Sequence, residues 1–177
     1  MMEGARSTAM MASSARSRIR ASRLVRSFKQ LSSSQLSDDR CACDIGSVIR
    51  DCLDAMSVET KKRKINMKPN WTETTRLPWV GYPGPLSQVL VNLIQNTLRY
   101  AYKGEATGDV DLRLAEDGET YTLEYEDDGG GVPADIFPRM FEPFVTSGRD
   151  IGGSGLGLAI SQNIMTNLLK GDITCTT

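Results

Sequence analysis

Leu86–Tyr102, whose sequence is LSQVLVNLIQNTLRYAY, is the stretch that decides the fold of this chain. At about 100° per residue, a helix over this stretch has one apolar face and one polar face. The apolar face carries Leu86, Val89, Leu90, Leu93, Thr97 and Ala101, and the polar face carries Gln88, Asn92, Asn96 and Arg99. Asn is a mediocre helix former because its side chain competes for backbone hydrogen bonds, so Asn92 and Asn96 need a reason. Either this is an ordinary solvated face, or the amides and Arg99 face a polyphosphate and its Mg2+, a cation that takes few protein ligands.

Two glycine-rich segments follow this helix along the chain. Residues 126–133, EDDGGGVP, come directly after a strand, and glycines there let the backbone approach a ligand closely. Asp127 can accept a hydrogen bond from an exocyclic amine, as a carboxylate does when it selects adenine; a plain glycine turn is the alternative.

Residues 152–158, GGSGLGL, open a second helix, where free N–H groups and the helix dipole favour phosphate. Leu158 stands where a dinucleotide-binding fingerprint needs Gly and where a Walker A loop needs Lys. The segment is therefore a phosphate cradle of another type or a flexible hinge.

The remaining periodicity predicts strands with a few helices instead of regular βαβ alternation, which favours an α+β two-layer sandwich. Helices are expected over 45–56, capped by Asp44, and over 154–169. Strands are expected over 64–69, 77–82, 110–115, 121–126 and 172–176, and irregular loops over 136–144 and 146–153.

Composition limits the function. The chain has 177 residues, 40% hydrophobic and 24% charged, which suits one compact domain with an appendage or two small domains. No run of about 18 apolar residues occurs, so no membrane span is expected. The chain has no histidine, which excludes Ser-His-Asp and Cys-His catalysis, His-ligated metals and phosphohistidine on this chain. Its four cysteines, Cys41, Cys43, Cys52 and Cys175, have poor zinc spacing and are predicted to be reduced and mostly buried.

Charge divides the chain into two parts. Residues 1–68 carry 14 Lys and Arg against 7 Asp and Glu, whereas residues 69–177 carry 7 against 15. Within the basic part an apolar stripe recurs at helical spacing: Ala21, Leu24, Val25, Phe28 and Leu31. The basic residues of this part, Arg16, Arg18, Arg20, Arg23, Arg26 and Lys29, are interpreted as the solvated face of that helix, with nucleic-acid binding and an organelle transit peptide as alternatives. A lone stripe must be buried on something, and a second copy of the chain is the expected partner.

Four segments together resemble the sequence boxes of the histidine-kinase ATPase superfamily, in order and at ordinary family spacing, over roughly residues 40–177. They are the N box (86–101, with Asn92 and Asn96 at the matching positions), the G1 box (127–131), the F box (141–144) and the G2 box (153–158). Residues 21–29, followed by Asp44-Ile45, also resemble the second helix of that family's dimerisation hairpin. The resemblance implies a Bergerat-type sandwich, a mixed sheet under three helices, preceded by a long N-terminal helix. Residues 1–38 would be the remnant of the dimerisation helix and residues 39–177 the ATP-binding domain without its last strand.

The resemblance also implies roles for individual residues toward Mg-ATP. Asn96 would hold Mg2+, Asn92 and Arg99 would face phosphates, Asp127 would bind adenine, and Tyr100 would stack or hydrogen-bond near the nucleotide. Residues 146–153 would form a lid whose only cation, Arg149, is a candidate γ-phosphate contact; Asn92 and Arg149 are the candidates for a catalytic role. The expected nucleotide contacts further include Gly129, Gly131, Val132, Phe144, Thr146, Ser147, Gly153, Ser154, Gly155, Leu156, Gly157 and Leu158.

The function implied is that of the catalytic domain of a bacterial sensor histidine kinase. It would transfer the ATP γ-phosphoryl group to a His on a hairpin helix outside this chain, and a response regulator receiver domain would then take it onto Asp. The parent protein would be a homodimer with this domain in the cytoplasm, without nucleic acid as partner, and anchored in the inner membrane only through upstream segments. Three departures are the absence of the phosphoacceptor His and its helix, the absence of the family's closing strand after Thr177, and Gly84 at a position that is often acidic. A mitochondrial-type kinase of the same nucleotide fold, an ATP-driven clamp of the gyrase or Hsp90 class, and an ATP-binding scaffold are the alternatives.

Overall fold

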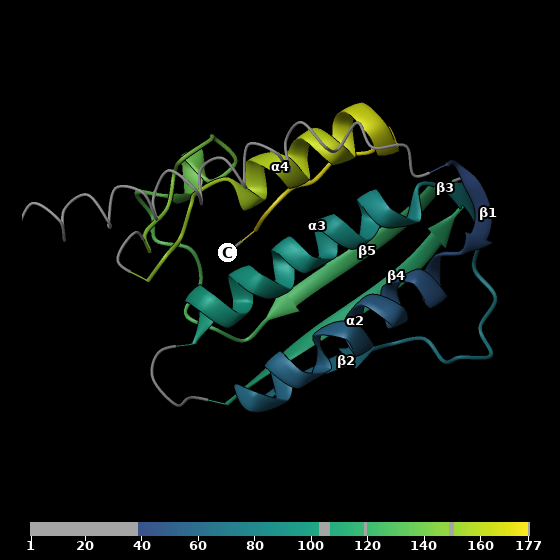
Figure 1. Ribbon diagram of the computed structural model, residues 1–177, viewed down its shortest axis with the longest axis horizontal. Coiled ribbons are helices and arrows are strands. Elements are labelled where there is room, and N and C mark those ends of the chain that lie inside the picture. The colour runs from purple at the N-terminus through teal and green to yellow at the C-terminus, as the bar shows by residue number, and fades with distance from the viewer. Residues whose placement is uncertain (1–38, 103–106, 119, 149–150, 177) are drawn as a thin grey trace, which may run out of the picture. The chain divides into compact units, whose positions relative to one another are not determined.

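The computed structural model of the chain describes residues 39–102, 107–118, 120–148 and 151–176 (Figure 1). Its helices are α2 (Ile45–Lys62), α3 (Pro83–Asn96) and α4 (Gly157–Asn163), with a 3-10 turn η2 (Phe137–Arg139). Its strands are β1 (Cys41–Asp44), β2 (Ile65–Pro69), β3 (Pro78–Gly81), β4 (Gly108–Asp117) and β5 (Thr120–Asp127). The N-terminal helix expected within residues 1–38 and the expected lid cation Arg149 lie outside the described residues.

The main sheet is mixed, as predicted. Its strand order is β2-β4-β5, with β2 parallel and β5 antiparallel to β4. β1 and β3 form a separate antiparallel pair. Helices α2 and α3 cover one face of the main sheet and α4 packs beside α3 (Figure 1). The predicted α+β sandwich of a mixed sheet under three helices is confirmed for the described residues.

The core lies between these helices and the inner face of the sheet. Its fully buried side chains include Ile49 of α2, Leu90 and Ile94 of α3, and Val110 and Leu112 of β4. Along β4 these apolar residues alternate with charged ones, as a strand with one solvated face requires. Since no layer among the described residues covers the other face, ion pairs such as Lys68–Asp109, with 2.7 Å between Nζ and Oδ2, lie there exposed.

Helix α2 begins where the sequence predicted and ends later. Asp44 caps it, because its Oδ1 accepts a hydrogen bond from the Ser47 N–H at 2.8 Å. The helix was expected to end at Met56 but continues to Lys62. The six residues beyond Met56 are polar apart from Val58, so the apolar stripe fades there; Lys61 and Lys62 nevertheless favour the helix by lying at the negative end of its dipole.

The helix expected over 86–102 changes geometry at Thr97. An α-helix up to Asn96 is followed by a π-helical turn, η1 (Thr97–Ala101), and the second helix likewise ends in a π-helical turn, η3 (Ile164–Leu169). A π-helical turn is wider than an α-helical turn, so the predicted 100° spacing does not hold beyond Asn96. Ile94, outside the predicted apolar face, is fully buried, whereas Leu93 on that face is only half-buried.

Two predictions about the C-terminal part need correction. No strand forms among residues 171–176, although their alternating pattern predicted one over 172–176. A strand exists only when its backbone pairs with a neighbour, and alternation by itself supplies no partner. The helix expected from Ser154 begins at Gly157 and ends at Leu169 as expected, counting η3.

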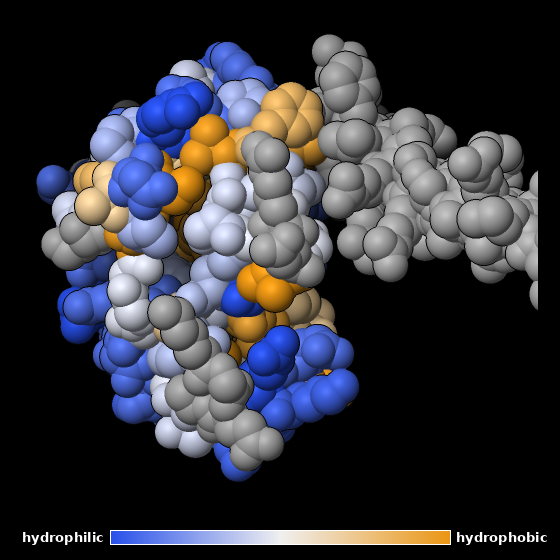
Figure 2. Space-filling model, turned by 90° about the vertical axis from the view of Figure 1, so that its left-hand side faces the viewer, coloured by the Kyte–Doolittle hydropathy of each residue, from blue (hydrophilic) through white to orange (hydrophobic). Residues whose placement is uncertain are grey.

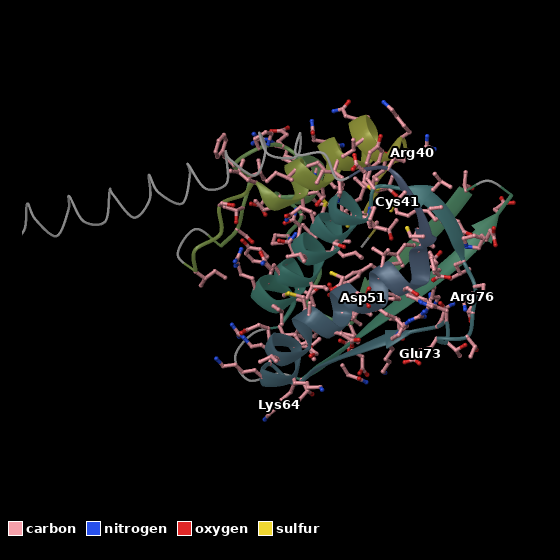
Figure 3. The ribbon with its side chains drawn as sticks, turned by 45° about the vertical axis from the view of Figure 1, so that its right-hand side comes forward. Arg40, Cys41, Asp51, Lys64, Glu73 and Arg76 are labelled. Atoms are coloured by element: carbon pink, nitrogen blue, oxygen red, sulfur yellow. The ribbon has the colours of Figure 1, made fainter. Side chains whose placement is uncertain are left out.

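The cysteines were expected to be mostly buried, and this is wrong. Only Cys52 is buried; Cys41 is exposed on β1 (Figure 3), and the other two are intermediate. Burial raises the pKa of the Cys52 thiol, which keeps it protonated and inert.

Among the described helices, none combines the length and the apolar character that crossing a membrane requires.

Candidate functional site

Asp127 is the last residue of β5, and its side chain contacts η1, the turn that follows α3. Its Oδ2 accepts a hydrogen bond from the Thr97 hydroxyl at 3.2 Å, and its Oδ1 accepts one from the Gly129 N–H at 3.1 Å. Thr97 Oγ1 also lies 2.9 Å from the hydroxyl of Tyr125, two residues earlier in β5. The carboxylate is thus fixed from both sides while it is only partly buried, which leaves it available as an acceptor.

The glycine loop after Asp127 lies directly on the end of the N-box helix. The Gly130 N–H donates to the Ala101 carbonyl at 2.9 Å. A Cβ on Gly129 would lie 2.6 Å from the Ala101 Cβ and 2.8 Å from Asp127 Oδ1, so only glycine fits. This close approach joins Asp127 to η1. Gly131, with φ of +69°, and the partly buried Val132 continue the loop.

Asp128 anchors the same loop on its other side. Its Oδ1 accepts hydrogen bonds from the Tyr102 hydroxyl at 2.5 Å and from the Asp109 N–H at 2.9 Å. The Tyr102 hydrogen bond lowers the pKa of the Asp128 carboxyl, while burial and the neighbouring Asp128 raise the pKa of the Tyr102 phenol. The first residues of β4 and the end of the N-box helix are therefore held together through one carboxylate.

Asn92 lies between α3 and α4 instead of on an open polar face. It is 8% exposed, and its Nδ2 donates to the Gly157 carbonyl at 3.0 Å and to Ser161 Oγ at 3.1 Å. Its Oδ1 accepts from Gln88 Nε2 at 3.1 Å. Helix α4 packs on this face of α3, which single-helix periodicity could not indicate.

The next polar residues of the N box are more accessible. Asn96, Arg99 and Tyr100 are all partly exposed, and within the described part of the chain the Asn96 side chain makes no hydrogen bond. The Arg99 guanidinium carbon lies 5.9 Å from the centre of the Tyr100 ring, at the outer limit of a cation–π contact. The amide oxygen of Asn96 is of the type that Mg2+ accepts, and its exposure fits the metal role.

The expected lid packs on Tyr100. The Tyr100 hydroxyl lies 3.0 Å from Thr146 Oγ1, which also accepts a hydrogen bond from the Gly148 N–H at 3.1 Å. The Gly153 N–H donates to the Gly148 carbonyl at 2.8 Å, so the described part of the lid closes on itself. Ser147 between them is exposed.

The G2 segment turns sharply before α4. Gly155 has φ of +68°, and a Cβ there would lie 2.5 Å from the Phe144 carbonyl carbon. The Phe144 N–H donates to the Gly155 carbonyl at 2.7 Å, and the Ser154 hydroxyl accepts from the Leu156 N–H at 3.3 Å. Phe144 is half exposed, whereas Leu156 is buried and anchors the turn; Gly157 and the half-buried Leu158 begin α4.

The structure brings these predicted residues to one end of the domain. Figure 2 views that end, where apolar side chains lie between polar ones in the middle of the face. Contacts join η1 to the glycine loop and to the lid, and α3 to the start of α4. Sequence reasoning missed four residues of this arrangement: Thr97, Tyr102, Tyr125 and Ser161. Of these four, only Thr97 had a signal in the sequence, because it is the only hydroxyl on the predicted apolar face.

Comparisons with known proteins agree with this geometry. Residues 81–177 match the family described as "Histidine kinase-, DNA gyrase B-, and HSP90-like ATPase". The chain is similar to the sensor protein kinase PilS of Pseudomonas aeruginosa, with 48% identity over 84 residues, which are 46% of this chain and 16% of PilS. It spans about a sixth or less of the length of the first curated relatives that it matches.

Solved structures share the fold. The histidine kinase AdeS of Acinetobacter baumannii superposes with a TM-score of 0.65 at 24% identity, covering 89% of this chain and 73% of AdeS. Full-length ShkA in complex with AMPPNP superposes with a TM-score of 0.59 at 28% identity, covering 80% of this chain and 29% of ShkA.

Proposed function

Because the chain belongs to the family of histidine kinase-, DNA gyrase B- and HSP90-like ATPases, we propose that it is the ATP-binding catalytic domain of a sensor histidine kinase. The similarity to PilS supports a sensor kinase over a gyrase-type clamp or a mitochondrial-type kinase. The observation that carries the proposal is Asp127, an oriented acceptor fixed beside the N-box helix by Thr97 and Gly129.

The residues divide the work on Mg-ATP between base, metal and phosphates. Asp127 accepts a hydrogen bond from the exocyclic amine of adenine, with Tyr100 beside the nucleotide. Asn96 offers its amide oxygen to Mg2+, which when bound neutralises charge on the phosphates. Arg99 and the backbone N–H groups of residues 155–157 face the phosphates, and Arg149 of the lid contacts the γ-phosphate. Asn92 can bind the phosphates only if its amide gives up its hydrogen bonds to Gly157 and Ser161. If it keeps them, its role is to hold the start of α4 in position for phosphate binding.

The γ-phosphoryl group passes from bound ATP, leaving ADP, to a histidine outside this chain, which has no histidine to receive it. Positioning and charge neutralisation are what such a transfer requires of a protein, and the proposed contacts supply both. The acceptor His belongs to a dimerisation hairpin of the parent homodimer, and a response regulator receiver domain takes the group from there. The domain works in the cytoplasm.

Binding of Mg-ATP by the chain is the first test. Isothermal titration calorimetry with a non-hydrolysable ATP analogue should show a saturable site, and Asp127→Asn should weaken it by about 1–3 kcal/mol, the range for a hydrogen bond to a charged group. Asp117→Asn is the matched control, because this exposed carboxylate lies at the opposite end of the β4–β5 hairpin. Equal affinities of the parental chain and Asp127→Asn would remove Asp127 from the adenine role, and no saturable binding would refute the proposed function.

A further inference from the structure

Thr97 is a buried hydroxyl with two polar neighbours. It is 4% exposed, and its Oγ1 lies 2.9 Å from Tyr125 Oη and 3.2 Å from Asp127 Oδ2. A threonine within a helix commonly donates to the carbonyl four residues earlier. Here the hydroxyl instead bonds across to strand β5, which separates it from an ordinary satisfied helix threonine.

The direction of these hydrogen bonds follows from donor counting. An ionised carboxylate only accepts, so the single Thr97 proton goes to Asp127. The Thr97 oxygen is then the acceptor for the proton of Tyr125. Burial raises the pKa of the Tyr125 phenol, so Tyr125 retains that proton. The three side chains therefore form a hydrogen-bond relay in which every proton points toward Asp127: Tyr125 donates to Thr97, and Thr97 donates to Asp127. Hydrogen bonds in such a series strengthen one another.

The relay and the glycine loop together fix the plane of the Asp127 carboxylate. Thr97 supplies a donor to Oδ2 and Gly129 supplies one to Oδ1 at 3.1 Å, so each carboxylate oxygen already accepts one hydrogen bond. Each oxygen has capacity for one further hydrogen bond, and only a donor can satisfy it. The fixed carboxylate can therefore accept a hydrogen bond from a ligand amine, whereas a ligand carbonyl would face an acceptor and be repelled.

We infer that Thr97 is a positioning residue for base selectivity: by holding Asp127 it makes this site accept purines that carry an amine at C6 and reject those with a carbonyl there. The inference rests on the proposed function, in which Asp127 binds adenine. An adenine amine donates to the fixed carboxylate, whereas the guanine carbonyl would place two acceptors against each other. A purine with only hydrogen at C6 gains nothing from the carboxylate.

The test measures selectivity, which a purely structural role for Thr97 would leave unchanged. The full chain and its variants are titrated with ATP, GTP and purine riboside triphosphate, which lacks the 6-amino group, in competition with a fluorescent ATP analogue. Thr97→Val keeps the shape and removes the donor. It should weaken ATP about five- to tenfold, leave purine riboside triphosphate unchanged, and so remove most of the preference between them. Thr97→Ser keeps the hydroxyl donor and should therefore keep the parental ratio of the affinities for ATP and purine riboside triphosphate.

A second threonine, on strand β5, provides the control. Thr122→Val changes an exposed threonine on the outer face of β5 and should leave all three affinities as in the parental chain. Equal weakening of ATP and purine riboside triphosphate in Thr97→Val, or an unchanged ratio, would overturn the inference while the proposed function stands. A parental chain that does not prefer ATP over purine riboside triphosphate would instead refute adenine binding by Asp127, and the inference with it. If Thr97→Val does not fold, Tyr125→Phe, which removes the donor to Thr97, serves for the same comparison. It should weaken ATP about twofold relative to purine riboside triphosphate. No such loss would overturn the inference.

Discussion

At the scale of single residues, Asp44 connects two parts of the domain with one carboxylate. Its Oδ1 caps helix α2 at the Ser47 N–H, and its Oδ2 accepts from the Leu77 N–H at 2.8 Å, just before β3. The hydrogen bonds from Leu77 and Ser47 lower the pKa of the Asp44 carboxyl. The charged form is therefore favoured in the folded state, and the start of α2 depends on it.

Asp44→Ala should reduce the free energy of unfolding by about 1–2 kcal/mol, the usual value of a helix cap. Urea unfolding monitored by circular dichroism measures it. Asp51→Ala on the exposed side of the same helix (Figure 3) should change stability by less than about 0.5 kcal/mol. Because the folded-state pKa is below the unfolded value, the stabilisation is present above about pH 4 and is lost as the pH falls through the folded pKa. A parental chain and an Asp44→Asn variant that lose stability in parallel on the acid side would contradict this role.

At the scale of elements, the described part of the lid, residues 146–148 and 151–153, has few contacts with the rest of the domain. Tyr100 reaches Thr146, and Thr146 in turn receives the Gly148 N–H, while Ile151 beyond them is 61% exposed. Segments with so little burial open at low free-energy cost, and active-site lids belong to this class. The lid is therefore the part of the site on which a bound nucleotide should have the largest effect.

Hydrogen exchange should detect this effect. The backbone amides of residues 146–153 should exchange fast without nucleotide and more slowly with a bound ATP analogue and Mg2+, because the lid then closes on the phosphates. Tyr100→Phe removes the hydroxyl that reaches Thr146 and should speed exchange at Gly148 in the nucleotide-free chain. Amides in the middle of α2 serve as the internal control. Strong protection of the lid in the absence of nucleotide would contradict the expectation.

At the scale of the whole molecule, the N-terminal apolar stripe needs a partner. Leaving it in water would cost on the order of 25 cal/mol per Å2 of apolar area. In the family that the chain resembles, a four-helix bundle of two hairpins buries such a stripe. We expect weak self-association through residues 1–34.

Light scattering of the full chain and of a variant lacking residues 1–34 tests the self-association. The full chain should show a concentration-dependent mass above that of one copy, and the shortened chain should be monomeric with unchanged thermal stability. The alternative is that residues 1–34 dock on the ATPase domain of the same chain: a monomeric full chain together with a shortened chain of lower stability would show this and exclude the dimer.

The sequence alone determined most of the elements and indicated the type of site, although it did not predict strand β1. Periodicity placed α2, α3 and the paired strands β4 and β5, because burial of one face leaves its imprint on every turn of a helix and every second residue of a strand. The Asp44 cap was predictable for the same local reason. The glycine segments at 127–131 and 153–157 indicated a nucleotide site because glycine marks where backbone must approach closely, as Gly129 does at Ala101.

Only the tertiary structure decided which polar groups meet. Asn92 looked solvated from its own helix and is buried, because α4 covers that face from 65 residues away along the chain. Thr97 looked like part of an apolar stripe; it is buried, but its hydroxyl donates to Asp127 of β5, 30 residues away along the chain. Residues 172–176 have the pattern of a strand but pair with none of the described strands. Local pattern records whether a side chain is buried, but its hydrogen-bond partners come from elements distant in sequence, and only the packed fold brings those together.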